Sequence, residues 1–156
     1  RMKTARDMIQ EKGGDILCVP LGTTVLNALQ KMNELKVGAI LVTRDDKPIG
    51  IWTERDLLRN TIDEAFNPHT TLIDDVMTKT IVTAPHSDTV YNLMDKFLGL
   101  RLRHLLIEKD GELIGMVSSG DVMKASIQEK DEELKQINSM VGWDYYENWC
   151  WRPDAK

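Results

Sequence analysis

Two junctions between a predicted strand and a predicted helix carry the residues that could do chemistry. One reads Gly50-Ile-Trp-Thr53-Glu-Arg-Asp56 and the other reads Gly115-Met-Val-Ser118-Ser-Gly-Asp121. Each junction provides a hydroxyl and, three residues later, a carboxylate. The start of a helix presents free N–H groups to a phosphate, the hydroxyl can donate a further hydrogen bond, and the carboxylate can accept both hydroxyls of a ribose. The functional interpretation of this pattern is a nucleotide site at each junction.

The same pattern also has a purely structural interpretation. Ser or Thr at the N-cap of a helix with an acid three residues later resembles a capping box, which satisfies free backbone N–H groups and suits the helix dipole without any ligand. Because capping signatures are common, a single junction favours this structural interpretation. The nucleotide hypothesis therefore depends on the rest of the chain.

The two junctions end two copies of one repeated pattern. Residues 16–59 and 81–124 align at a constant offset of 65 positions without a gap. Identical pairs include Pro20/Pro85, Thr24/Thr89, Gly50/Gly115 and Asp56/Asp121. Because a repeat unit usually cannot bury its apolar face alone, two copies predict one body with pseudo-two-fold symmetry. Any site at the seam between the copies should then occur twice.

Each copy is predicted to fold as β-α-β-β-α, which makes the chain an α/β (α+β) protein. Apolar residues at helical spacing predict helices over 25–35 and 90–100. Apolar runs at 38–43 and 103–108 predict strands that enter hairpin turns at 44–47 and 109–112, each followed by a further strand. Short strands are expected before the first helices, over 16–19 and 80–83, and second helices from Thr53 and Ser118.

These elements divide the chain into a first repeat over 3–62, a connector over 63–76, a second repeat over 77–128 and a C-terminal helix and aromatic tail over 129–156. The connector carries no evident chemistry. The tail holds three tryptophans and two tyrosines between Trp143 and Trp151. It could close over a bound base, but packing within the chain or in a dimer is favoured because aromatic side chains dominate such contacts.

Composition excludes several classes of function. The chain has 156 residues, 42% of them hydrophobic, and a net charge of −5, so we expect neither a nucleic-acid partner nor a membrane association. Cys18 and Cys150 lack metal or redox spacing, which fits a cytoplasmic location. The three histidines occupy separate contexts, so no metal site is expected. Walker-type and nucleophile-elbow motifs are missing, so we do not expect an enzyme.

The duplicated units, each ending in Gly-apolar-x-Thr/Ser-x-x-Asp, resemble a tandem pair of CBS domains, also called a Bateman module, over roughly residues 3–128. The chain is similar to small stand-alone members of that family. The resemblance implies a regulatory or energy-sensing module without a required cofactor. It implies an adenine nucleotide ligand, such as AMP, ADP, ATP or NAD, in the cleft between repeats. It further implies a homodimer that signals by conformational change to an unknown partner protein in trans.

The resemblance also implies which residues hold the ligand. The ribose-binding carboxylates fall on Asp121 and Asp56, and the base is expected against the first strand of the opposite copy. One site should therefore combine Asp121, Ser118 and Ser119 with Ile16, Leu17 and Val19. The other should combine Asp56 and Thr53 with Thr80, Ile81 and Ala84.

The copies differ where phosphates would lie. Arg103 and His104 stand where the first copy has Gly38-Ala39, and Arg55 stands where the second copy has Gly120. We expect a phosphate beside Asp121 to meet Arg103 and His104, and one beside Asp56 to meet Arg55, helped by Arg59. On this assignment the Asp121 site is the better anion binder. The alternative is an oligomeric interaction scaffold without nucleotide binding, in which the arginines are solvated surface charges.

Overall fold

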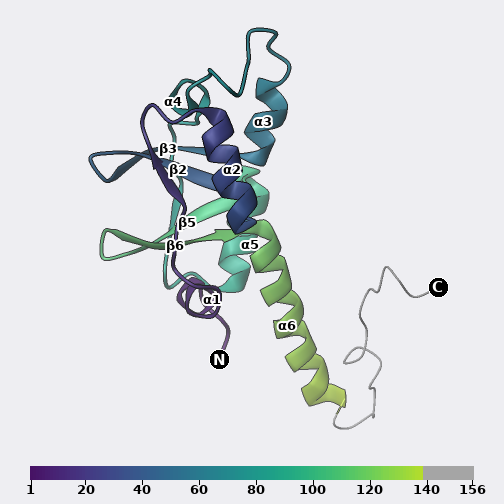
Figure 1. Ribbon diagram of the computed structural model, residues 1–156. Coiled ribbons are helices and arrows are strands. Elements are labelled where there is room, and N and C mark those ends of the chain that lie inside the picture. Colours follow the sequence, from purple (N-terminus) through teal and green to yellow (C-terminus); the bar gives the residue numbers. More distant parts are fainter. Residues whose placement is uncertain (139–156) are drawn as a thin grey trace, which may run out of the picture.

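Each copy of the repeat forms its own three-stranded sheet in the computed structural model, which describes residues 1–138 (Figure 1). In the first sheet, β1 (Cys18–Pro20) runs parallel to β2 (Ala39–Arg44), which pairs antiparallel with β3 (Lys47–Thr53). In the second, β4 (Thr83–Pro85), β5 (His104–Lys109) and β6 (Glu112–Ser118) repeat this order and these directions. Both predicted hairpins are confirmed, since Arg44 pairs with Lys47 and Lys109 pairs with Glu112.

The first strand of each copy begins later than expected. The strands predicted from Ile16 and Thr80 begin at Cys18 and Thr83 instead. The preceding residues run along the sheet of the other copy. Thr78 exchanges two backbone hydrogen bonds of 2.8 Å with Ile51 of the first sheet. A side chain at Gly14 would begin 2.7 Å from the carbonyl oxygen of Ile114 in the second sheet. Each lead-in therefore reaches its own sheet only after crossing from its neighbour.

The predicted helices form in both copies. They are α2 (Val25–Leu35) and α3 (Glu54–Asn60) in the first, and α5 (Val90–Leu100) and α6 (Ser119–Asn138) in the second. Thr24 and Thr89 cap α2 and α5, and each helix ends in a left-handed residue, Lys36 or Arg101. The helix that begins the C-terminal segment is continuous with the last helix of the second repeat, and it projects beyond the sheets (Figure 1). The aromatic tail lies outside the described residues.

Each of two further helices precedes one copy in the sequence but packs in the core of the other. Ala5, Met8 and Ile9 of α1 (Ala5–Lys12) pack into the core of the second copy, although α1 precedes the first. Conversely, Ile73 of α4 (Ile73–Val76), in the segment expected to be a mere connector, is fully buried in the core of the first copy. Each hydrophobic core thus includes the helix that precedes the other repeat, and this exchange ties the halves together.

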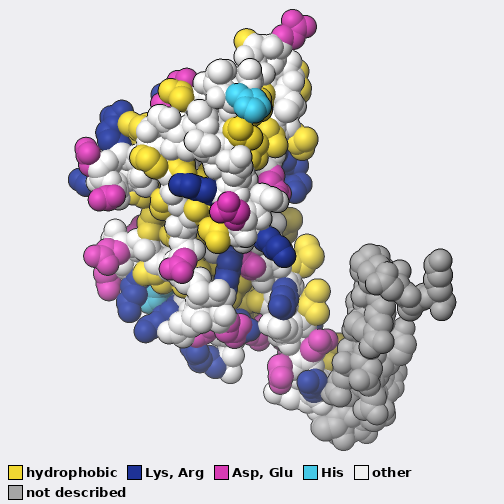
Figure 2. Space-filling view, viewed as in Figure 1, with side chains coloured by type: hydrophobic (Ala, Val, Ile, Leu, Met, Phe, Trp, Pro, Cys, Tyr) yellow, Lys and Arg dark blue, Asp and Glu magenta, His cyan; other side chains and the backbone are white. Residues whose placement is uncertain are grey.

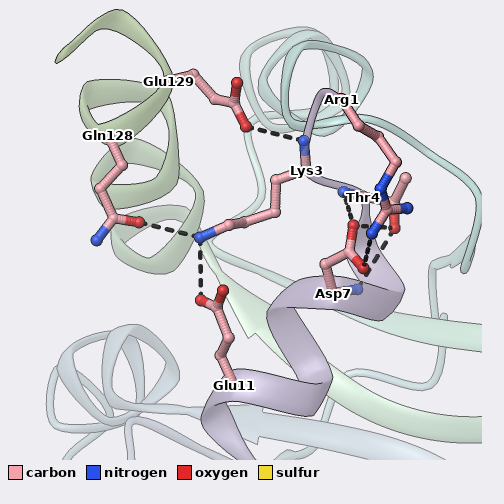
Figure 3. A network of polar contacts seen from close by, with 7 residues as sticks. All are labelled: Arg1, Lys3, Thr4, Asp7, Glu11, Gln128 and Glu129. Carbon is pink, nitrogen blue, oxygen red and sulfur yellow. Dashed lines mark hydrogen bonds and ion pairs between the residues drawn. The ribbon is translucent and has the colours of Figure 1, made fainter. Parts of the chain in front are cut away.

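The N-terminal segment is also fastened to α6 by polar contacts (Figure 3). The backbone N–H of Lys3 donates to Glu129 at 2.8 Å, and its ammonium donates to Gln128 at 3.1 Å and to Glu11 of α1 at 3.0 Å. Thr4 and Asp7 form a capping box that starts α1. None of the described helices is long and apolar enough to cross a lipid bilayer.

Candidate functional site

Asp56 is buried at the beginning of α3. The residue is only 4% exposed and is the one charged residue in the core of the described part of the chain. Its Oδ2 accepts the backbone N–H of Thr53 at 2.9 Å and the Thr53 hydroxyl at 3.2 Å, while the Asp56 N–H donates to that hydroxyl at 3.4 Å. The guanidinium of Arg59, one turn later, donates to Oδ1. The capping-box interpretation of this junction is therefore confirmed.

The same junction forms one wall of a cavity of about 490 Å³ between the two halves. A volume of this size suits a small-molecule ligand. Its walls are formed by the end of β3 and the start of α3, by the lead-in to the second copy, and by the segment that joins α5 to β5 together with the start of β5. Its lining comprises Ile51, Thr53, Arg55, Asp56, Arg59, Thr78, Thr80, Ile81, Val82, Arg101, Leu102, Arg103, His104 and Leu106.

This cavity brings together most of the residues that we expected beside Asp56. Thr53, Arg55, Thr80 and Ile81 all line it. Ala84 is fully buried in the second core and is not among the lining residues. Because the lead-in over 78–82 crosses from the first sheet to the second, its residues can face α3 of the opposite copy. Thr80 and Ile81 of the second copy therefore line the same cavity as Asp56 of the first.

Arg103 and His104 lie in the Asp56 cavity, although we expected them to serve the Asp121 site. The left-handed residue at the end of α5, Arg101, directs the following residues along the seam opposite α3 before they enter β5. Arg101 itself lines the cavity and was missed by the sequence analysis. Its signal was the alternation Arg101-Leu-Arg103, which places two cations at the entry of a strand.

Asp121 is already engaged by another element. Its Oδ2 accepts the Ser118 backbone N–H at 2.8 Å and the ammonium of Lys12 at 2.6 Å, and Lys12 also donates to the Met116 carbonyl at 3.0 Å. Burial alone would raise the pKa of Asp121, but the Lys12 ion pair and the Ser118 N–H outweigh it and hold the pKa below its ordinary value. Lys12 is a further contact that sequence reasoning missed.

The surroundings of Asp121 differ from those expected. It lines a separate cavity of about 150 Å³, together with residues of α1 and α6. Ile16, Leu17 and Val19 are not among that lining, and Val19 is fully buried in the first core. Ser118 accepts the Asp121 N–H at 3.1 Å, and the N–H of Ser119 donates to the Arg103 carbonyl at 2.9 Å. The two motif copies therefore have different environments.

His104 lies between these two regions. It is half-buried, and its Nδ1 has no hydrogen-bond partner within the described part of the chain. Burial and the positive charges of Lys12 and Arg103 hold the pKa of His104 below its ordinary value, against the opposing effect of Asp121 and Glu54. A neutral imidazole with a free nitrogen can donate to or accept from a ligand. No three His, Cys, Asp or Glu side chains of residues 1–138 gather in a way that could hold a metal ion.

Comparison with known proteins agrees with this architecture. A family model for the CBS domain matches the chain twice, over residues 5–63 and 73–128. The mitochondrial CBS domain-containing protein CBSX3 of Arabidopsis thaliana is 33% identical over 151 residues, which are 91% of this chain and 73% of that protein. The structure of a CBS-domain-containing protein from Agrobacterium tumefaciens, 33% identical, matches with a TM-score of 0.75 over 80% of this chain and 99% of that one.

Two more distant structures, similar in fold, were solved with ligands. The CBS domain protein PAE2072 of Pyrobaculum aerophilum, complexed with AMP, is 20% identical, with a TM-score of 0.65 over 76% of this chain and 89% of that one. The CBS domain pair of protein MJ0100, in complex with 5′-methylthioadenosine and S-adenosyl-L-methionine, is 14% identical, with a TM-score of 0.70 over 83% and 99%. Since the plant relative is named as mitochondrial, the cytoplasmic location remains a prediction. With two matches that together span most of its length, the chain belongs to the CBS domain family and carries two consecutive copies of the domain.

Proposed function

We propose that this protein is a regulatory module, not an enzyme, that binds an adenine nucleotide in the Asp56 cavity. The observation that carries the proposal is the composition of that cavity, in which a buried carboxylate faces apolar side chains and arginines across the seam. The AMP complex of the distant relative supports the same class of ligand. The space-filling view shows Lys and Arg side chains interspersed with Asp and Glu side chains around the middle of the visible face (Figure 2).

Each part of a nucleotide finds a suitable group in this cavity. Asp56 can accept the ribose hydroxyls, although the ligand must first compete with Arg59 for Oδ1. Ile81, Val82 and Leu102 offer apolar surface for the base. The arginines can bind phosphate through charge-assisted hydrogen bonds.

The Asp56 site can be tested by substitution. Titration of the purified protein with ATP, AMP and NAD is expected to give saturable binding. Asp56→Asn, which keeps an acceptor for the capping bonds, should weaken that binding by about tenfold or more, because a charge-assisted hydrogen bond is lost. Asp121→Asn is the matched variant in the other copy and should weaken binding less. Unchanged affinity in Asp56→Asn would overturn this assignment.

The proposal includes a second site, beside Asp121, that binds the nucleotide more weakly. A ribose there would have to displace the Lys12 ammonium from Oδ2. The groups available would be Ser118 and Ser119 with the lead-in residues Ile16 and Leu17. Equal weakening of nucleotide binding by Asp56→Asn and Asp121→Asn would indicate two equivalent sites and contradict the proposal that the Asp121 site is the weaker one.

The regulatory part of the proposal rests on how the halves are joined. Because α1 and α4 each pack in the core of the opposite copy, they connect the two copies. A ligand at the seam contacts both of these connected copies. Binding changes the angle between copies, or between subunits of a homodimer, only if the ligand has unequal affinity for the two arrangements. An unidentified protein in trans would then receive the signal. The scaffold alternative predicts an unchanged melting temperature with every nucleotide.

A further inference from the structure

We infer that the Asp56 cavity selects nucleoside di- and triphosphates over monophosphates and rejects cationic adenosine derivatives such as S-adenosylmethionine. This inference rests on the proposed function and names the ligand class of the same site. The observation behind it is an excess of cations: Arg55, Arg59, Arg101 and Arg103 line the cavity, with Asp56 as the single carboxylate among the lining residues.

Most of these arginines are available to a ligand. Arg59 is paired with Asp56, but its side chain is 68% exposed. Across residues 1–138, no ion pair or side-chain hydrogen bond engages Arg55, Arg101 or Arg103. Guanidinium groups that share a cavity repel one another until an anion neutralises them, so each added phosphate charge relieves more of this repulsion. A sulfonium ligand would add to it.

The cavity beside Asp121 shows that this excess is not a general property of the fold. There, Lys3, Lys12 and Lys124 are accompanied by Glu11 and Asp121. Lys12 is bound to Asp121 at 2.6 Å and Lys3 to Glu11 at 3.0 Å. Cations and carboxylates there nearly balance, in a chain whose overall net charge is −5. The arginine cluster is therefore a local feature of the Asp56 cavity.

The cavity also has room for a longer phosphate chain. A second groove of about 800 Å³ adjoins it, and Thr53, Arg55, Arg103 and His104 line both. Lys36 adds a further cation to the groove, and Glu54 is its only carboxylate. A chain of phosphates leaving the cavity past Arg103 would therefore remain in a cationic environment. Arg55 and Arg103 are the specificity-determining residues in this arrangement, because they line both the cavity and the groove.

Titration calorimetry with ATP, ADP, AMP and S-adenosylmethionine tests the inference. We expect ATP to bind at least about tenfold more tightly than AMP, corresponding to one charge-assisted contact, and S-adenosylmethionine to give no saturable binding in the same range. The preference for ATP should shrink as salt is raised, because exposed charges are screened. Magnesium-free buffer keeps the phosphate charge unmasked.

Arg55→Gln and Arg103→Gln should each weaken the binding of ATP by about tenfold and the binding of AMP by less than about threefold. Arg44→Gln, on the exposed hairpin of the first sheet, removes the same charge away from the cavity and should leave the ATP:AMP ratio unchanged. AMP binding as tightly as ATP, or an unaltered ratio in both cavity variants, would overturn the inference while leaving the nucleotide site intact. If no nucleotide binds the wild-type protein, the proposed function itself fails.

Discussion

At the scale of single residues, His104 is expected to make stability depend on pH. Its pKa is below the ordinary value in the folded protein, chiefly because of burial and then because of Lys12. The unfolded chain therefore binds a proton at a higher pH than the folded one. The free energy of unfolding should be at its full value above about pH 6.5, the unperturbed pKa of histidine, and should decrease as the pH falls toward the folded-state pKa.

Urea unfolding between about pH 5 and pH 8 measures this effect. His104→Gln, which cannot take up a proton in this range, should lose stability less steeply on acidification. Asp121 and Asp7 have lowered pKa values, so their contributions to the free energy of unfolding are lost only below about pH 3.8, outside this pH range. Identical slopes in the wild type and His104→Gln would show that protonation of this ring is not linked to folding.

At the scale of elements, the repeated glycines mark where an exchanged helix meets a sheet. A Cβ at Gly115 of β6 would lie 2.4 Å from Cδ1 of Ile9 in α1, and one at Gly50 of β3 would lie 2.3 Å from the sulfur of Met77. Either distance is far inside van der Waals contact. The glycines that accompany the nucleotide motif therefore allow α1 and the residue after α4 to approach the sheets.

Gly115→Ala is accordingly expected to lower the free energy of unfolding by about 1–3 kcal/mol, the usual cost of overpacking. Ile9→Ala leaves a cavity that the new methyl group can partly fill, so the double variant should lose less than the sum of the two single losses. Gly99→Ala is a control, because a methyl group there meets nothing within 4 Å and lies in a helix, where alanine is favoured. Strict additivity in urea unfolding would contradict this explanation.

At the scale of the whole molecule, the repeat made the internal order of each half predictable, but not the relation between halves. Hairpins at 44–47 and 109–112 and helices at 25–35 and 90–100 depend on local turn chemistry and periodicity, which a sequence displays directly. The position of α1 against the second core depends on packing between distant segments. Such packing leaves no periodic signal. For the same reason Arg103 could be recognised as a candidate phosphate ligand, but the cavity that it lines could not be predicted.

Most of the exposed large apolar side chains in residues 1–138 fall into pairs related by the repeat, and we expect them to form a homodimer surface. Leu35 and Leu100 are equivalent positions, as are Leu58 and Met123, and Ile62 and Ile127, and each is at least half exposed. The rest of the apolar stripes over 25–35 and 90–100 is mostly internal, since Val25, Val90 and Phe97 are buried. A face with its own pseudo-two-fold axis can meet a copy of itself in an isologous contact.

We therefore expect light scattering to give the wild-type protein twice the chain mass of 17.8 kDa. Leu58→Glu combined with Met123→Glu should give the single-chain mass, because two carboxylates on each face would be brought against their counterparts and desolvated. Lys47→Glu on the hairpin, which projects away from the helices (Figure 1), adds negative charge without touching this face and should remain dimeric. A wild-type mass of one chain, or a double variant that still dimerises, would exclude this surface. Nucleotide regulation would then have to act within the single chain, through the seam that α1 and α4 hold together.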